Sequence, residues 1–245
     1  MWFANDMFRL SYLPNVIIPI LFAVFSSSNL SIVNVMPYIV GWSFIMTYAN
    51  LLNDAIDQDR KLPIGRKSLT VLLLVFIIFS LVLLRNHILY VLIAIIGWAL
   101  YDWKIKGVPF LDIALLISLG LIPYIAISDF VDFNIITVFV GFGVVALLVD
   151  KIVDEPKYKG VSKISSKILI LTSISLSIFL MYINVVAYSN YWYILPLIPF
   201  LLGIAILFTF LKKYIKSSIK IIAVYSGNVL MFYLFALLIE MGKFI

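Results

Sequence analysis

Long runs of apolar residues, separated by short polar stretches, dominate the chain. In a run such as 71–84 nearly every position is apolar, whereas a strand of a membrane barrel would alternate apolar and polar residues. A helix that crosses a bilayer needs about 20 largely apolar residues. The pattern therefore predicts an all-α, polytopic membrane protein with nine spans, near 12–27, 33–52, 69–85, 87–101, 109–128, 134–149, 168–188, 191–211 and 219–240.

The composition supports this interpretation and narrows the chemistry. Of the 245 residues 64% are hydrophobic and 12% are charged, against about 45–50% and 25% in soluble domains. Nine spans leave no room for a large soluble domain, so we expect a single transmembrane domain over 1–245. Without Cys and with one His, the chain cannot form disulfides or thiol nucleophiles, and His-rich metal sites are not expected. Any chemistry must rest on Asp, Glu, Lys, Arg, Tyr and bound metal ions.

The basic residues predict the orientation of the chain in the membrane. All 18 Lys and Arg residues except Arg85 and Lys243 lie before the first span or after even-numbered spans. Because Lys and Arg gather in cytoplasmic loops, the N-terminus is predicted to be cytoplasmic and the C-terminus outside. The first span lacks a small-residue cleavage site, so we expect it to be retained. The net charge of +6 then reflects membrane topology, and no nucleic-acid partner is expected.

Carboxylates collect at the predicted cytoplasmic ends of two spans. Asp54 and Asp57 follow span two beside Asn53, and they share one face if the helix continues. Asp150 and Asp154 end span six with a spacing of four. Two facing carboxylate pairs repel unless cations hold them, and Mg²⁺ prefers such oxygen ligands together with phosphate. Since basic residues flank both pairs, the sequence predicts a Mg²⁺-bridged diphosphate site in a multi-pass protein of the cell membrane, facing the cytoplasm.

Three short motifs follow spans two, four and six in this order. They are Asn53-Asp54-x-x-Asp57, Tyr101-x-x-x-x-Lys106-x-x-Pro109 and Asp150-x-x-x-Asp154. Together with the nine spans, the order resembles the UbiA superfamily of intramembrane prenyltransferases over nearly the whole chain. The resemblance implies transfer of a prenyl chain from a polyprenyl diphosphate, such as geranylgeranyl diphosphate, to a lipophilic acceptor in the membrane.

The resemblance also implies roles for individual residues. The carboxylates of the two acidic motifs would act in catalysis and hold Mg²⁺, while basic residues would bind the diphosphate. The implied metal ligands are Asn53, Asp54, Asp57, Asp150 and Asp154, of which the four carboxylates Asp54, Asp57, Asp150 and Asp154 are the catalytic residues. The implied diphosphate-binding residues are Arg60, Lys61, Arg66, Lys104, Lys106, Lys151 and Lys157.

The motifs depart from the family pattern at two positions. Lys61 stands where the first motif usually ends in Asp, with Asp59 two residues earlier, and Glu155 is the candidate for another absent Asp after the second motif.

The prenyl carbocation that forms as diphosphate leaves is stabilised by aromatic faces in a dry cavity. We expect Tyr48 and Tyr101, near the ends of spans two and four, to line that pocket.

Two other classes of function fit part of the pattern. Ionisable residues in membrane helices also mark secondary transporters. A non-catalytic isoprenoid-binding protein would not need the third carboxylate of the first motif, the position where this chain has Lys61. The acceptor remains open among an aromatic or quinone precursor, a glycerol-phosphate ether lipid and a haem. Prenyl chain length and oligomeric state do not follow from the sequence.

Overall fold

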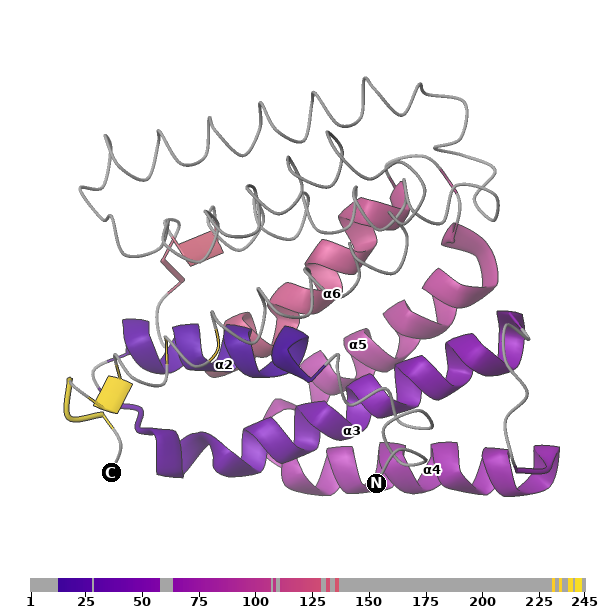
Figure 1. Ribbon diagram of the computed structural model, residues 1–245, viewed down its shortest axis with the longest axis horizontal. Coiled ribbons are helices and arrows are strands. Elements are labelled where there is room, and N and C mark those ends of the chain that lie inside the picture. Colours follow the sequence, from indigo (N-terminus) through magenta and orange to yellow (C-terminus); the bar gives the residue numbers. More distant parts are fainter. Residues whose placement is uncertain are drawn as a thin grey trace, which may run out of the picture. The chain divides into compact units, whose positions relative to one another are not determined.

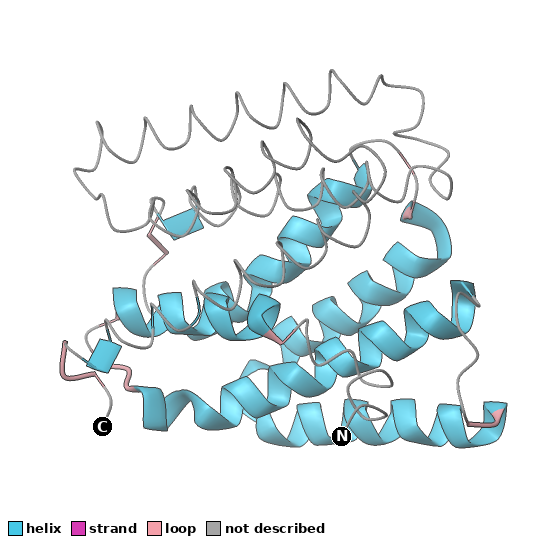
Figure 2. Cartoon of the chain, viewed as in Figure 1, coloured by secondary structure: helices cyan, strands magenta, loops and turns pink. Residues whose placement is uncertain are grey.

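A computed structural model describes about half of the chain. The described residues are 13–27, 29–57, 64–106, 108, 111–128, 131–132, 135–136, 231, 234, 238–239 and 241–243. Within them the regular elements are helices and none is a strand (Figure 2). The chain divides into two compact units, one made of 1–106, 118–130 and 234–245 and the other of 107–117 and 131–233. The site described below lies in the first unit.

Five of the predicted spans correspond to described helices (Figure 1). The elements are α2 (Pro14–Ser26), α3 (Ile32–Asp57), α4 (Arg66–Leu83), the 3-10 turn η2 (Arg85–His87), α5 (Ile88–Leu100), the π turn η3 (Tyr101–Ile105) and α6 (Leu111–Ile127). The prediction of helices is confirmed for this part of the chain. The later four predicted spans lie almost entirely outside the described residues, so their number and the orientation of the termini stay predictions.

The described helices have the length and surface of membrane spans. The stretches Ile32–Asp57, Arg66–Leu83 and Arg85–Ile105 are long and apolar enough to cross a bilayer. Helix α4 exposes a series of large apolar side chains, among them Val71, Leu74 and Val82. A continuous apolar face of this kind is unfavourable in water and is satisfied by lipid. The described part of the chain therefore fits a polytopic membrane protein.

Helix α4 packs closely against α3. A Cβ atom on Gly41 would lie 2.7 Å from Cγ of Leu84, so the glycine allows the fully buried Leu84 to reach the α3 backbone. The Ser80 hydroxyl lies 3.1 Å from the Gly41 carbonyl oxygen and 2.8 Å from that of Phe76. A small residue and a hydroxyl at the contact are typical of helix packing in membranes.

Two helices continue beyond the ends of their predicted spans. Helix α3 runs on to Asp57, five residues past the predicted end at 52. Helix α5 passes into η3, where the backbone N–H of Lys106 donates to the Tyr101 carbonyl oxygen at 2.8 Å. This bond spans five residues and defines the π turn. The two extensions carry the polar residues that follow the apolar runs.

A lysine near the C-terminus caps the end of α2. The Lys243 ammonium donates to the carbonyl oxygens of Val24, at 2.9 Å, and Phe25, at 3.2 Å, and also to that of Ser27. In return, the backbone N–H of Ile32 donates to the Lys243 carbonyl oxygen at 2.9 Å. Burial lowers the pKa of Lys243 below its ordinary value of 10.5. The lysine satisfies carbonyl groups that a helix end leaves without partners, and its charge opposes the negative end of the helix dipole.

Candidate functional site

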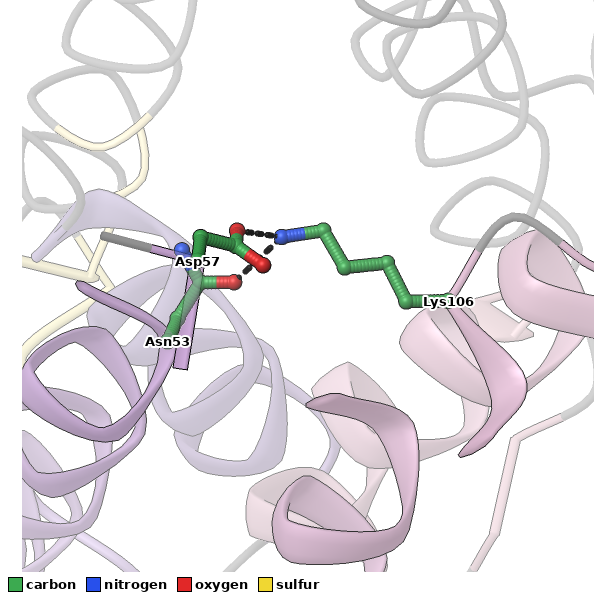
Figure 3. Close-up of polar contacts among 3 residues, drawn as sticks. All are labelled: Asn53, Asp57 and Lys106. Atoms are coloured by element: carbon green, nitrogen blue, oxygen red, sulfur yellow. Dashed lines mark hydrogen bonds and ion pairs between the residues drawn. The ribbon is translucent and has the colours of Figure 1, made fainter. Parts of the chain in front are cut away.

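Three polar side chains meet where α3 and η3 end. Asn53 and Asp57 lie one helical turn apart on α3, and Lys106 directly follows η3. Figure 3 shows the Lys106 side chain reaching across to both. Its ammonium donates to Oδ1 of Asn53 at 2.7 Å and forms an ion pair with Oδ2 of Asp57. We call Asn53, Asp57 and Lys106 the Lys106 cluster.

The cluster is partly withdrawn from solvent. The side chains of Lys106 and Asp57 are 18% and 20% exposed, so their attraction is screened less than that of a fully exposed pair. Asp54, three residues before Asp57, is only 1% exposed. A carboxylate is retained in such surroundings only with compensating donors or cations. The expected continuation of the helix through the first acidic motif is confirmed.

The aromatic residues expected to line a pocket are both buried. Tyr48 is 7% exposed on α3, and Tyr101 is 6% exposed in η3. The rings of Trp98 and Tyr101 pack edge to face, with their centroids 6.0 Å apart. That Tyr48 and Tyr101 line a prenyl pocket stays a prediction.

Asp102 is a buried carboxylate that is not one of the named positions in the three motifs. Its side chain is 6% exposed within η3, and its carboxylate lies close enough to the Tyr48 hydroxyl to interact with it electrostatically. The sequence offered one signal for it, because Asp102 directly follows the predicted span 87–101 just as Asp150 directly follows the span 134–149. The residue places a buried carboxylate in η3, separate from the buried Asp54 on α3, and π turns of this kind often occur at functional sites.

The remaining predicted diphosphate ligands are only partly described. Arg66, the first residue of α4, and Lys104 are both exposed, and the Lys104 ammonium lies 4.7 Å from the centre of the Trp103 ring. Among the described residues, neither forms an ion pair with a carboxylate. The other candidates lie outside the described residues: Asp59, Arg60, Lys61, Asp150, Lys151, Asp154, Glu155 and Lys157. The second acidic motif is therefore a prediction only.

The oxygen atoms at the end of α3 suit a hard divalent cation. Asn53, Asp54 and Asp57 offer amide and carboxylate oxygens, the donors that Mg²⁺ prefers. In the described part of the chain, no three His, Cys, Asp or Glu residues are grouped closely enough to hold a metal ion. The oxygen atoms of Asn53, Asp54 and Asp57 suit such a cation by type, and an ion bound to them would need further donors.

Comparison with known proteins identifies the fold. In sequence, the chain matches no protein-family model and no curated protein. In structure, it is similar to a UbiA homolog from Archaeoglobus fulgidus bound to GPP and Mg²⁺, with a TM-score of 0.64 and 14% identity over 95% of this chain and 98% of the other. The same homolog bound to DMAPP and Mg²⁺ gives a TM-score of 0.60 and 15% identity over 95% and 97% of the two chains.

A digeranylgeranylglyceryl phosphate synthase is similar to the same degree. Its TM-score is 0.61 at 16% identity, over 95% of this chain and 94% of the other. The chain thus has the fold of the UbiA homologues along almost its whole length. The resemblance that the motifs indicated is confirmed at the level of the fold.

Proposed function

We propose that this protein is a UbiA-type prenyltransferase, which moves a prenyl chain from a polyprenyl diphosphate to a lipophilic acceptor in a Mg²⁺-dependent reaction. The observation that carries the proposal is the Lys106 cluster. It joins the first acidic motif to the basic residue of the motif after span four, in a fold whose similar structures bind GPP or DMAPP with Mg²⁺. Oxygen donors for a cation and an ammonium for an anion meet at one point.

The acidic residues supply the cation side of the proposed site. Asn53, Asp54 and Asp57 would hold Mg²⁺, with Asp150 and Asp154 from the second motif as the complementary set. When bound, the ion stabilises the negative charge that develops on the diphosphate as the bond to the allylic carbon breaks. Without that compensation, two facing carboxylate motifs would repel a diphosphate.

The basic residues supply the anion side. Lys106 is proposed to contribute its charge from the Lys106 cluster, and Arg66 and Lys104, both exposed, are proposed as further ligands of the diphosphate. Positive groups placed where charge develops lower the barrier because they interact more strongly with the transition state than with the bound substrate. Arg60, Lys61, Lys151 and Lys157 are proposed to surround the diphosphate in the same way.

The buried tyrosines would act on the other fragment. When diphosphate departs, the allylic carbon becomes cationic, and the faces of Tyr48 and Tyr101 can stabilise it. Both side chains are buried, and a carbocation held against them would be shielded from capture by water. The acceptor then attacks this carbon and loses a proton.

The acceptor is proposed by class. A glycerol-phosphate ether lipid is the first candidate, because a digeranylgeranylglyceryl phosphate synthase is among the similar structures. An aromatic or quinone precursor is the second. We place the reaction on the cytoplasmic face of the cell membrane, where the basic loops are predicted to lie.

A secondary transporter and a non-catalytic isoprenoid-binding protein are the competing functions. A transporter would use charges near the middle of broken helices. The carboxylates of the first motif instead lie at the end of α3, which favours docking of an anionic headgroup from one side of the membrane.

The proposal is tested by diphosphate release. Purified protein in detergent is given geranylgeranyl diphosphate, Mg²⁺ and each acceptor class in turn. We expect diphosphate release to require both Mg²⁺ and an acceptor. The variants Asp54→Ala and Asp150→Ala should each abolish this release. Asp132→Asn is the matched control. Asp132 follows the fifth predicted span, on the predicted outer side of the membrane, so this variant should retain activity. A folded protein that releases no diphosphate with any acceptor would contradict the proposal.

A further inference from the structure

The Lys106 ammonium contacts the same oxygen atoms that are proposed to bind a divalent cation. It lies on Oδ1 of Asn53 and Oδ2 of Asp57, both from α3, while Lys106 itself belongs to the end of η3. A lysine is suited to this position because its charge sits at the end of a flexible four-carbon stem. The Lys106 ammonium can therefore contact either the oxygens of Asn53 and Asp57 or an anion bound nearby.

We propose that Lys106 is an internal cation that competes with the divalent cation for Asn53 and Asp57, and that it turns to the diphosphate when it is displaced. This inference rests on the proposed function only for the assignment of Asn53 and Asp57 as cation ligands. Two cations on one carboxylate oxygen repel each other strongly in a partly buried site. Occupation of these oxygens by Lys106 and by a divalent ion is therefore mutually exclusive.

The competition would couple the two halves of substrate binding. While Lys106 contacts Asp57, its charge is neutralised and attracts an anion weakly. Release of the ammonium restores a free positive charge beside the site at the moment when the oxygens have taken another cation. Binding of the cation thus prepares the site for a diphosphate, which orders the two binding events.

The first experiment measures the release of Lys106 in the wild-type protein without substrate. The protein is acetylated briefly with an amine-reactive reagent, with and without Mg²⁺, and each lysine is quantified by peptide mass spectrometry. Contacts with Asn53 and Asp57 shield the Lys106 nitrogen from the reagent, so Mg²⁺ should accelerate its acetylation severalfold. The exposed Lys104 serves as the internal reference and should not respond. Unchanged or slower labelling of Lys106 in Mg²⁺ would overturn the proposal.

The second experiment measures cation affinity directly. Mn²⁺ is titrated into the protein in detergent and the free ion is counted by electron paramagnetic resonance. We expect Lys106→Met to bind Mn²⁺ about tenfold more tightly than wild type, equal to about 1.4 kcal/mol. Arg85→Gln is the charge-matched control, because Arg85 lies in the exposed turn η2, and it should bind as wild type does. Equal or weaker binding by a folded Lys106→Met protein would refute the competition.

Neither experiment contains a prenyl diphosphate or an acceptor. If diphosphate release fails while Mg²⁺ still frees Lys106, the proposed function is wrong and the competition stands. If release succeeds while Lys106 labelling does not respond to Mg²⁺, the enzyme assignment stands and the competition is wrong.

Discussion

Two lysines, Lys106 and Lys243, are each held at the end of a helix in the first unit, but they contact different kinds of atoms. Lys243 donates to three backbone carbonyl oxygens at the end of α2. Lys106 donates to the side chains of Asn53 and Asp57 on α3. Backbone carbonyls are present at the end of any helix, whereas an amide and a carboxylate one turn apart depend on the residues chosen there.

The difference separates a lysine that supports the fold from one that serves a site. The contacts of Lys243 replace partners that the end of α2 would otherwise find in water. The contacts of Lys106 neutralise a carboxylate that an apolar residue could have replaced at no cost to the helix. We expect substitutions at the Lys106 cluster to change activity more than stability, and a substitution at Lys243 to do the reverse.

The largest expected effect is the loss of Asp57. Asp57→Asn keeps the size of the side chain and one acceptor oxygen but removes the negative charge that favours a divalent cation. We expect prenyl transfer at saturating substrate to fall at least about a hundredfold, or about 3 kcal/mol in the barrier. Diphosphate release under single-turnover conditions measures it. Activity within threefold of wild type would remove Asp57 from the site.

The next effect is the loss of the Lys106 charge. Lys106→Met retains most of the apolar stem, so we expect a tenfold to hundredfold decrease in transfer, typical of losing one positive group from a developing negative charge. The free energy of unfolding should change by about 1 kcal/mol or less, since partly exposed ion pairs contribute little. A large loss of stability with normal activity per folded molecule would make Lys106 a structural residue like Lys243.

The opposite pattern is expected for Lys243. Lys243→Met removes the donor from three carbonyl oxygens, and we expect a loss of about 1–3 kcal/mol in the free energy of unfolding. Denaturation in detergent, followed by circular dichroism, measures this loss. Transfer activity at a temperature where the variant is folded should equal that of wild type, and a selective loss of activity would end the contrast between the two lysines.

The smallest expected effect is a dependence of stability on pH. Burial lowers the pKa of Lys243, so between that lowered value and 10.5 the folded chain binds fewer protons than the unfolded chain. The contribution of Lys243 therefore increases the free energy of unfolding as pH rises from the lowered pKa to 10.5. This increase is absent below the lowered pKa. Unfolding measured across this range should show a shallower rise in Lys243→Met than in wild type. Identical slopes would show that Lys243 does not contribute.

Much of the described fold could be predicted from the sequence because apolar runs long enough to span a bilayer leave few alternatives. The ends of the helices were less predictable. The run of apolar residues stops near 52, yet α3 continues to Asp57. A polar residue at the end of a span can be helical or not, and the sequence nearby does not decide between the two. Here the charge of Asp57 is compensated by Lys106 after η3, far along the chain.

The candidate site was predictable in part for the same reason. The spacing of Asp54 and Asp57 indicated one helical face, and the resemblance of the motifs pointed to Lys106. The direct contact between the first motif and Lys106 could not be predicted, because it depends on how α3 and η3 pack. Asp102 could not be singled out in the same way, because it is a lone carboxylate beside basic and aromatic neighbours and not one of a pair.

The π turn makes the direction of the Lys106 side chain depend on its spacing from Tyr101. Lys106 is five positions after Tyr101, and the backbone bond between the Lys106 N–H and the Tyr101 carbonyl oxygen joins these same two residues. An α-helix advances about 100° with each residue, so deleting one residue here would swing the following side chain by about that angle. The position of the lysine charge is thus encoded by the number of residues in one turn of backbone, and not only by their identity.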